Sequence, residues 1–364
     1  MNFKSLANKY VCDVPVYEPG RPIEEVAREM GLDARTIIKL ASNENPLGPS
    51  PKALIAMRKA LATAHLYPDG GGFYLRQGIA KKLGVKIDNI VLGTGSNEII
   101  EFLFHVFVSP GDEVVAGDRA FVIYSIMAKM FQGRCVEVPF KGHTHDLKAM
   151  LAAITPRTKL VFVANPNNPT GTRVTDAELD DFVKRLPPHV IAVLDEAYIE
   201  FLDDPPPSIK YALERNVIVL RTFSKIVGLA GVRIGYGVAQ KECIDLLARV
   251  RQPFNTNAIA QAGALAALGD AAHIRKTKAL TRRGLAYLYR EFTKLGLEFV
   301  PSGANFVLVN VGDGDEVFRA LQRGGVIVRP MRGYKMPAWI RVTVGTMEEN
   351  RRFIAALKLA LLGK

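Results

Sequence analysis

Lys225 is the residue whose setting most favours covalent chemistry in this 364-residue sequence. It follows the apolar run 217–220, which is typical of a buried parallel strand, and it lies close to the hydroxyl groups of Thr222 and Ser224. Partial burial lowers the pKa of an amine, and the neutral amine can attack a carbonyl group to form a Schiff base. The residues around it leave one alternative open, which is an ordinary lysine at a sheet edge.

Asn168 and Asp195 follow apolar runs in the same way. The run 160–164 leads into a turn rich in proline and asparagine that contains Asn168, and the run 190–194 ends at Asp195. Ligands of open α/β sheets bind outside the carboxyl ends of the strands. A buried aspartate needs a cationic partner, such as a pyridinium nitrogen, and Asn168 can offer a neutral amide donor. The pattern therefore predicts one site that includes Asn168, Asp195 and Lys225.

Two further segments have the chemistry of an anion site. The planar guanidinium group of Arg233 can donate two hydrogen bonds to a phosphate, although an ordinary ion pair is the alternative. Residues 90–100 predict a strand, a glycine turn and a helix, so that the amides of Gly95, Ser96 and Asn97 would point at an anion. A plain N-cap by Ser96 is the alternative there. A dinucleotide fingerprint needs a third glycine where this sequence has Glu98, which argues against a nicotinamide-dependent oxidoreductase.

Segment 222–236, Thr-Phe-Ser-Lys-Ile-Val-Gly-Leu-Ala-Gly-Val-Arg-Ile-Gly-Tyr, resembles the pyridoxal-phosphate lysine segment of fold-type I, class I/II aminotransferases. Asn-Pro-Asn-Asn-Pro-Thr-Gly at 165–171 and Asp-Glu-Ala-Tyr at 195–198 match the other ordered motifs, so the resemblance covers essentially the whole chain. It implies an α/β fold: a large domain with a mostly parallel sheet flanked by helices, and a smaller α+β domain. Ile226-Val227 replaces the alanine and aromatic residue that most relatives have after the lysine.

The resemblance also implies roles for single residues. Lys225 would form the internal aldimine with pyridoxal 5'-phosphate and move the proton during ping-pong transamination, Asp195 would keep the pyridine nitrogen protonated, and Tyr198 would hydrogen-bond the ring hydroxyl. Phe121 could stack on the ring, or it could be a core aromatic residue. The catalytic set is thus Lys225, Asp195 and Tyr198, and the predicted cofactor-binding set is Tyr67, Gly95, Ser96, Asn97, Phe121, Asn168, Asp195, Tyr198, Thr222, Ser224, Lys225 and Arg233.

Four residues are expected to bind substrate: Tyr17, Asn45, Arg329 and Arg341. Arg341 is the only charged residue in the predicted strand 340–344, and Arg329 ends the predicted strand 326–328. Salt bridges at a sheet edge are the alternative for both, whereas in the family the Ile-Arg-x-Thr-x-Gly arginine binds the anionic end of the substrate.

The motifs at 17–22, 43–46 and 328–331 resemble those of histidinol-phosphate aminotransferases. This resemblance implies histidinol phosphate and 2-oxoglutarate as substrates, with glutamate as a product. Aromatic amino-acid aminotransferases and threonine-phosphate decarboxylases are similar enough to stay as alternatives.

The predicted domains are 45–255 for the large cofactor-binding domain, and 1–44 with 256–364 for an N-terminal arm and a small C-terminal domain. In the family a Tyr-Pro-Asp-Gly turn, here 67–70, reaches across a dimer interface to the neighbour's cofactor phosphate. The resemblance therefore implies a homodimer with composite active sites, while a plain surface turn is the alternative. One helix is predicted over 23–30, because Pro22 precedes it and Gly31 follows it.

Composition excludes several classes of function. The net charge of +12 comes without any block of basic residues or nucleic-acid motif, so it favours steering of small anions, or solubility alone, over nucleic-acid binding. No apolar run is long enough for a membrane span and no signal peptide is evident, so a cytoplasmic protein is expected. Cys12, Cys135 and Cys243 are too far apart for a metal site. His143 and His145 lack a nearby third ligand, which predicts a surface loop and no metal.

Overall fold

A seven-stranded sheet carries the residues singled out above, in a computed structural model that describes residues 2–17 and 19–362. Glu18 of the 17–22 motif lies outside the described residues. The strand order is β2-β8-β7-β6-β5-β3-β4; β8 runs antiparallel to β2 and β7 on either side of it, and all other neighbouring pairs are parallel. The strands are β2 (Ile90–Gly93), β3 (Glu113–Gly117), β4 (Arg134–Val138), β5 (Thr158–Ala164), β6 (Ile191–Asp195), β7 (Val217–Thr222) and β8 (Gly235–Val238).

Helices cover both faces of this sheet because its central strands are apolar on both sides. In β5, Val161 and Val163 face one hydrophobic core while Leu160 and Phe162 face the other. One face is packed by α3 (Pro51–Ala60), α4 (Phe73–Leu83), α7 (Leu147–Ala152), α8 (Asp176–Arg185), α9 (Ser208–Glu214) and α11 (Ala258–Leu268). The other face is packed by α5 (Ser96–Phe107), α6 (Ile123–Met130) and α10 (Lys241–Val250). The predicted mostly parallel sheet flanked by helices is confirmed.

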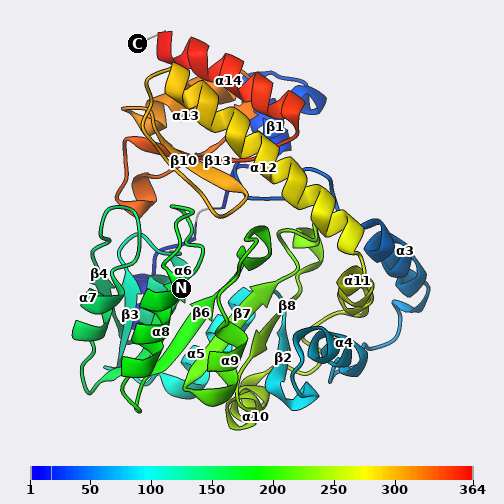
Figure 1. The fold of residues 1–364 in the computed structure, drawn as a ribbon, viewed down its shortest axis with the longest axis vertical. Helices are drawn as coiled ribbons and strands as arrows, with labels where there is room; N and C mark the ends of the chain where they lie inside the picture. The colour runs from blue at the N-terminus through cyan, green and yellow to red at the C-terminus, as the bar shows by residue number, and fades with distance from the viewer. Residues whose placement is uncertain (1, 18, 363–364) are drawn as a thin grey trace.

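A second, antiparallel sheet lies above the first in Figure 1, in the order β12-β13-β10-β9. Its strands are β9 (Phe299–Val300), β10 (Phe306–Asn310), β12 (Arg329–Pro330) and β13 (Trp339–Thr343), and α12 (Ala271–Lys294), α13 (Gly314–Arg323) and α14 (Met347–Leu362) pack beside it. The 24-residue helix α12 starts beside α11 and runs upward to α14 (Figure 1). These elements form the smaller α+β part of the predicted fold, whereas the boundaries near residues 44 and 255 remain a prediction.

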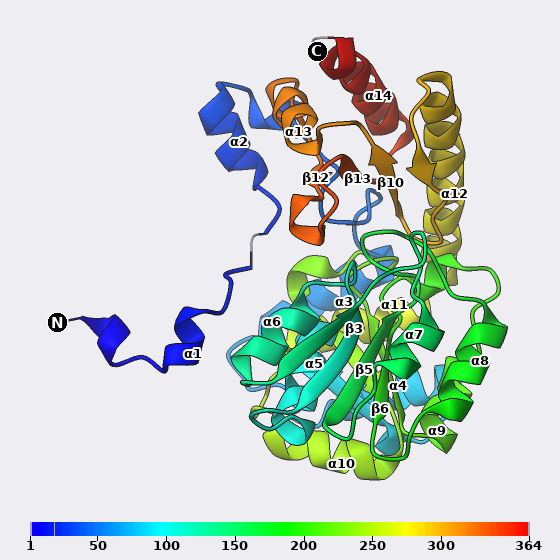
Figure 2. The same ribbon diagram turned by 90° about the vertical axis from the view of Figure 1, so that its left-hand side faces the viewer.

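The N-terminal part of the chain pairs with a strand of the smaller α+β part, in a separate two-stranded sheet, before it enters the large sheet. Helix α2 (Ile23–Met30) has the predicted bounds, and Gly31 ends it in the left-handed conformation with φ of 66°. Strand β1 (Ile38–Lys39) then pairs in parallel with β11 (Val326–Ile327). Figure 2 shows α2 next to α13, while α1 (Lys9–Cys12) lies on a segment that reaches away from the rest of the molecule.

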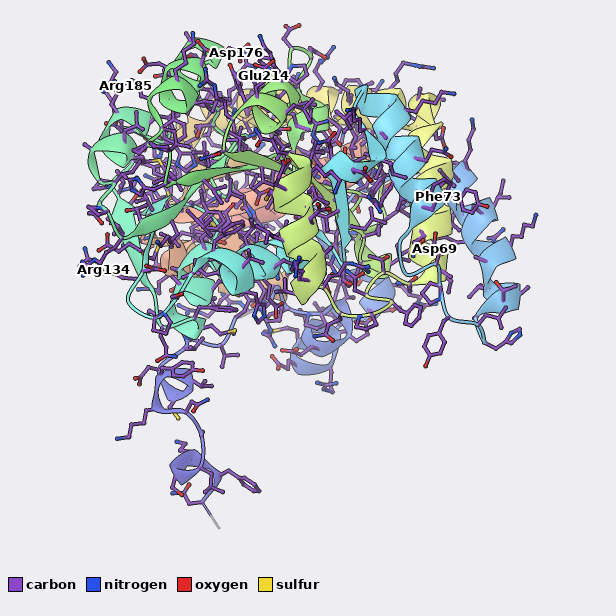
Figure 3. The ribbon with its side chains drawn as sticks, turned by 90° about the horizontal axis from the view of Figure 1, so that it is seen from below. Asp69, Phe73, Arg134, Asp176, Arg185 and Glu214 are labelled. Carbon is purple, nitrogen blue, oxygen red and sulfur yellow. The ribbon has the colours of Figure 1, made fainter. Side chains whose placement is uncertain are left out.

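The loop around Tyr67 lies on the outside of the molecule. Asp69 holds its shape, because its carboxylate accepts hydrogen bonds from the backbone N–H groups of Gly71 at 2.9 Å and Phe73 at 2.6 Å. Asp69 and Phe73 lie at the edge of the molecule in Figure 3. Tyr67 itself is 82% exposed and stacks on Phe254. The predicted loop is present, and α4 follows it directly.

The interpretation of residues 143–145 as a surface loop is wrong for His145. This side chain is buried, and its ring packs against Phe140 with 4.6 Å between the ring centroids. Burial lowers the pKa of His145 to about 4, so the ring is neutral. His143 packs on the edge of Trp339. Within residues 2–17 and 19–362, no group of three or more histidine, cysteine or acidic side chains is arranged to hold a metal ion, and no helix is long and apolar enough to cross a membrane.

Candidate active site

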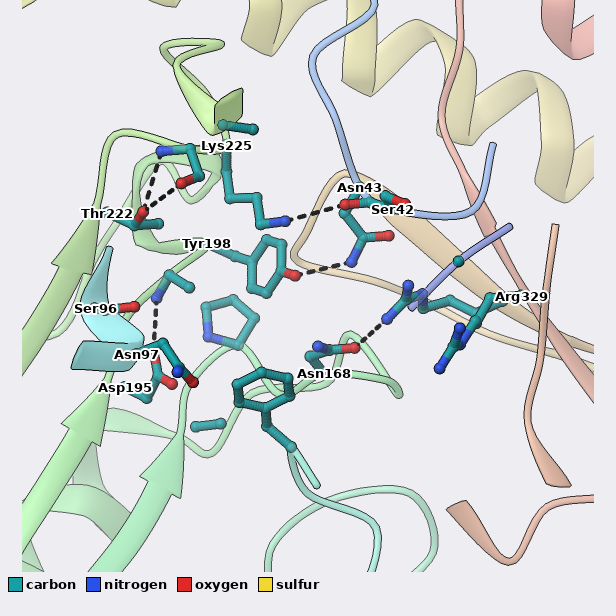
Figure 4. A pocket seen from close by; sticks show the side chains of 18 of the residues that line it. Ser42, Asn43, Ser96, Asn97, Asn168, Asp195, Tyr198, Thr222, Lys225 and Arg329 are labelled. Atoms are coloured by element: carbon teal, nitrogen blue, oxygen red, sulfur yellow. Dashed lines mark hydrogen bonds between the residues drawn. The ribbon is translucent and has the colours of Figure 1, made fainter. Parts of the chain in front are cut away.

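A cavity of about 230 Å³ opens at the carboxyl ends of β5, β6 and β7, between the two sheets (Figure 4). The strands place Asn168, Asp195 and Lys225 around it, because β5, β6 and β7 are parallel neighbours whose ends lie at one edge. Most of the predicted site residues line this cavity: Tyr17, Ser96, Asn97, Phe121, Asn168, Asp195, Tyr198, Thr222, Ser224, Lys225, Arg233, Arg329 and Arg341.

The amine of Lys225 points across the cavity. Its Nζ donates to the backbone carbonyl of Ser42 at 3.1 Å and lies 5.7 Å from the centre of the Tyr198 ring. Burial, reinforced by the positive charge of Arg341, lowers the pKa of Lys225 to about 8. A useful fraction of this amine is therefore neutral near physiological pH, which is the form that can attack a carbonyl group.

The carboxylate of Asp195 is buried and is held by neutral donors. The hydroxyl of Tyr124 donates to Oδ2 at 2.8 Å, and the backbone N–H of Ala197 donates to Oδ1 at 3.3 Å. Burial raises the pKa of Asp195, because neither donor compensates fully for lost hydration. A cationic group bound in the cavity would stabilise the ionised carboxylate.

The wall of the cavity next to α5 has the features of a phosphate cradle. Helix α5 begins at Ser96, so Gly95 rather than Ser96 occupies the cap position, and its φ is 80°. A Cβ atom at Gly95 would lie 2.4 Å from Nη2 of Arg233, so only glycine lets the guanidinium approach the helix N-terminus. Arg233 also donates to the hydroxyl of Ser224 at 3.4 Å. The arginine, the hydroxyl and the helix N-terminus together fit an anion.

The opposite wall is formed by β12 and β13 and holds two arginines. Arg329 and Arg341 are directly opposite each other in the antiparallel register. Arg341 is buried, donates to the side-chain oxygen of Asn168 and donates to the backbone carbonyl of Ala41 at 2.7 Å. Burial lowers the pKa of Arg341, and both of these acceptors are neutral. In this structure Asn168 therefore accepts through its amide oxygen, in addition to the donor function expected for its nitrogen.

Three of the predicted residues, Tyr67, Asn45 and Gly95, do not line the cavity, although Gly95 lies against Arg233, which does. The amide of Asn45 is buried elsewhere, where it donates to the backbone carbonyl of Ile226 at 2.8 Å and to the hydroxyl of Thr277 at 3.1 Å. Tyr67 is on the outer surface, away from the cavity of its own chain. The predicted contact of Asn45 with substrate therefore has no counterpart in this arrangement.

Ten of the residues that line the cavity were not predicted, and four of these have polar side chains: Ser42, Asn43, Tyr124 and Tyr334. Asn43 donates from its amide to the Tyr198 hydroxyl at 2.8 Å, and burial raises the pKa of Tyr198 to about 12. Tyr124 comes three residues after Phe121, so the spacing of a helical turn could have placed the two side chains together. Asn43 lies two residues before Asn45 in one polar turn, and only the tertiary fold distinguishes them.

Comparison with known proteins agrees with this geometry. Residues 35–357 match the family model for class I and II aminotransferases. The chain is 50% identical to the histidinol-phosphate aminotransferase of Akkermansia muciniphila, over 99% of this chain and 100% of that protein. It is also 50% identical to the enzyme of the same name from Moorella thermoacetica, over 96% of this chain and 91% of that protein.

A solved structure extends the agreement to the fold. Histidinol-phosphate aminotransferase from Sinorhizobium meliloti, in complex with pyridoxal-5'-phosphate, superposes with a TM-score of 0.90 at 29% identity, over 99% of this chain and 98% of that one. The sequence match, the superposition and the site geometry lead to one conclusion: this chain is a member of the class I and II aminotransferase family.

Proposed function

We propose that this chain is a pyridoxal-phosphate-dependent aminotransferase that moves the amino group of histidinol phosphate to 2-oxoglutarate, giving imidazole acetol phosphate and glutamate. The relatives named histidinol-phosphate aminotransferase support this assignment, because their sequences are 50% identical to this one over nearly the full chain. The observation that carries it is the pair Arg329 and Arg341, side by side on one wall of the cavity.

Like charges directly opposite each other on neighbouring strands are unfavourable unless an anion lies between them. The positive charge of Arg329 contributes to the lowered pKa of Arg341, which is the electrostatic cost of this arrangement. A phosphate carries up to two negative charges and several acceptor oxygens, so it suits a paired arginine site better than a neutral aromatic side chain does. The two carboxylates of 2-oxoglutarate suit the same site.

The residues present fit pyridoxal phosphate. The cradle of Gly95, Ser224 and Arg233 fits its phosphate, and the buried Asp195, held by neutral donors, fits a protonated ring nitrogen. When bound, the cofactor supplies an aldehyde that takes up amino groups and a ring that withdraws electrons. We assign Asn168 and Tyr198 to its ring hydroxyl, Phe121 to its ring face, and Ser96, Asn97 and Thr222 to the phosphate end.

The chain's own groups then have separate tasks. Lys225, with its pKa of about 8, takes and returns the proton that moves during transfer of the amino group. Asp195 maintains negative charge behind the ring. Burial alone raises the pKa of Asp195, so the ionised form depends on the cationic ring nitrogen, and exclusion of water strengthens the attraction between the two charges. Arg341 orients the substrate, while Asn168 and Ala41 hold the guanidinium in place.

A comparison of amino donors tests the substrate assignment. We expect kcat/KM for histidinol phosphate to exceed that for phenylalanine and tyrosine by about a hundredfold or more, equal to roughly 2.7 kcal/mol of transition-state binding. Arg329→Gln should lower the preference for histidinol phosphate over phenylalanine and tyrosine, because a phosphate with up to two negative charges gains more from the second arginine than a single carboxylate does. Equal kcat/KM for all three donors would instead favour an aromatic amino-acid aminotransferase, and release of carbon dioxide from threonine phosphate would favour the decarboxylase.

We also propose that the enzyme is a cytoplasmic homodimer with composite sites. Tyr67 is exposed and distant from its own cavity, and large apolar side chains are exposed on the neighbouring segments. These include Ile55, Leu61, Leu66, Phe73, Tyr74, Phe254 and Leu265. Exposed apolar groups of this size and number support a protein interface.

Mixed dimers test the composite site. A Lys225→Ala subunit combined with a Tyr67→Phe subunit should form one site in which both native residues are present. The mixture, after subunit exchange, is therefore expected to show more activity than the two variants measured separately. A mixture of wild-type and Lys225→Ala chains serves as the control for exchange. Activity equal to the average of the parents would show that each site is built within one chain.

A further inference from the structure

Asn43 makes contacts that connect the two sheets through the cavity. Its amide nitrogen donates to the Tyr198 hydroxyl at 2.8 Å, and its backbone N–H donates to Oγ1 of Thr343 at 2.9 Å. The Thr343 hydroxyl donates back to Oδ1 of Asn43 at 3.2 Å, and the amide of Asn305 donates to the backbone carbonyl of Asn43 at 3.1 Å. Asn43 is only 1% exposed, so water does not compete for these bonds.

The bond from Thr343 determines which end of the Asn43 amide faces Tyr198. Because the Thr343 hydroxyl donates to the amide oxygen, the NH₂ group is the end that meets the phenol. A tyrosine hydroxyl has one proton to donate. The Tyr198 oxygen accepts from Asn43, so its own proton is free to point into the cavity that Tyr198 lines.

Asn43 is the last of three consecutive residues that each contact a side chain of the site. Arg341 donates to the carbonyl of Ala41, Lys225 donates to the carbonyl of Ser42, and Asn43 donates to Tyr198. Figure 4 shows Ser42 and Asn43 together beside Lys225 and Tyr198. The φ of Asn43 is 55°, a left-handed conformation that asparagine tolerates better than most residues.

We propose that Asn43 is a positioning residue that turns the Tyr198 hydroxyl proton into the cavity, toward the ring oxygen of the bound cofactor, and couples this orientation to the strand that carries Arg341. Thr343 and Arg341 are two residues apart on β13, and therefore on the same face of the strand. A shift of β13 would change the orientation of the Asn43 amide and, through it, the direction in which the Tyr198 hydroxyl proton points. This inference rests on the proposed cofactor and transamination.

The pH at which the bound cofactor changes colour reports on the Tyr198 proton. A hydroxyl donor stabilises the ionised ring oxygen, so loss of that donor should raise the midpoint of the absorbance titration. Asn43→Gly keeps the left-handed backbone and removes the amide. It should raise the midpoint by about 0.5 pH unit or more, as expected for the loss of one hydrogen bond. Asn43→Asp should raise it further, because a carboxylate accepts the phenol proton and adds negative charge.

A double-mutant cycle separates this role from a structural one. In a Tyr198→Phe enzyme, whose midpoint should itself be raised, Asn43→Gly is expected to cause no further shift, because the group that it orients is gone. Thr343→Val is a second test, because it removes the hydrogen bond that fixes the Asn43 amide. It should raise the midpoint of the titration when Tyr198 is present and should leave the midpoint of the Tyr198→Phe enzyme unchanged. Thr343→Ser, which keeps the hydroxyl, is the matched control.

The possible outcomes are distinct. A parent enzyme that binds no coloured cofactor, or does not transaminate, would overturn the proposed function itself. With an active parent, unchanged midpoints in Asn43→Gly and Thr343→Val would overturn the role of Asn43. An equal shift from Asn43→Gly with and without the Tyr198 hydroxyl would overturn it too, whatever the change in melting temperature.

Discussion

Lys225→Ala is expected to fold normally and to lose transamination by about 10⁴-fold, the upper range for removal of an acid–base group. The loss should be this large because Lys225 is the amine whose lowered pKa of about 8 suits both carbonyl attack and proton transfer. Folding should survive, because within residues 2–17 and 19–362 the side chain makes a single hydrogen bond, to the Ser42 carbonyl. Alanine also removes an amine whose charged form is disfavoured by burial.

The measurement is the steady-state rate of transamination, followed by a coupled assay of the glutamate formed, together with thermal unfolding of the same samples. Lys225→Arg is the matched control, because arginine keeps a positive charge in the cavity and does not release its proton. Both variants should be inactive if the neutral amine is required. Activity retained in Lys225→Arg would mean that the charge alone matters, and near-normal turnover in Lys225→Ala would refute the assignment.

Asp195→Asn is expected to keep most of its bound cofactor while its transamination rate falls by about a hundredfold, or roughly 2.7 kcal/mol of barrier. Asparagine can still accept from the Tyr124 hydroxyl and fill the same space, so the change removes the charge and little else. Negative charge behind the ring is needed most when electrons move into the ring, which occurs in the transition state. Cofactor binding relies more on the phosphate cradle around Arg233.

Single-turnover kinetics, with cofactor occupancy taken from absorbance, separates the two effects. Asp195→Glu should lose less rate than Asp195→Asn, because glutamate keeps the charge but shifts it by one methylene group. A parent-like rate with full occupancy in Asp195→Asn would exclude this carboxylate as the partner of the ring nitrogen.

The strands that hold the site could be predicted because they are buried on both faces. Their side chains form continuous apolar runs, and the polar residues that follow each run lie at the strand end: β6 ends at Asp195, and β7 ends at Thr222, three residues before Lys225. Helix α2 could be predicted because Pro22 and Gly31 flank it with local backbone preferences. These features depend on neighbours in sequence, so pattern is enough to find them.

Residues that depend on distant partners could not be placed in this way. Asn43 enters the cavity because Thr343, 300 residues later, accepts its backbone N–H, whereas Asn45 meets Thr277 instead. His145 is buried against Phe140 although it lies in a polar turn, and the residues around it in the sequence do not indicate this burial. Tyr67 lies outside the cavity of its own chain, so its proposed role depends on a second subunit.

The length of α12 has a mechanical consequence. At 1.5 Å per residue, its 24 residues form a rod about 36 Å long that is anchored at one end beside α11 and at the other against α14. A rod pivoting at its lower end multiplies small rotations, so that a tilt of about 5° displaces its far end by about 3 Å. The pivot end holds Thr277, which accepts from Asn45 next to the lysine segment. Substitutions near this lower end of α12 would therefore change the position of the cavity wall that carries Arg329 and Arg341, although the substituted residues contact no ligand.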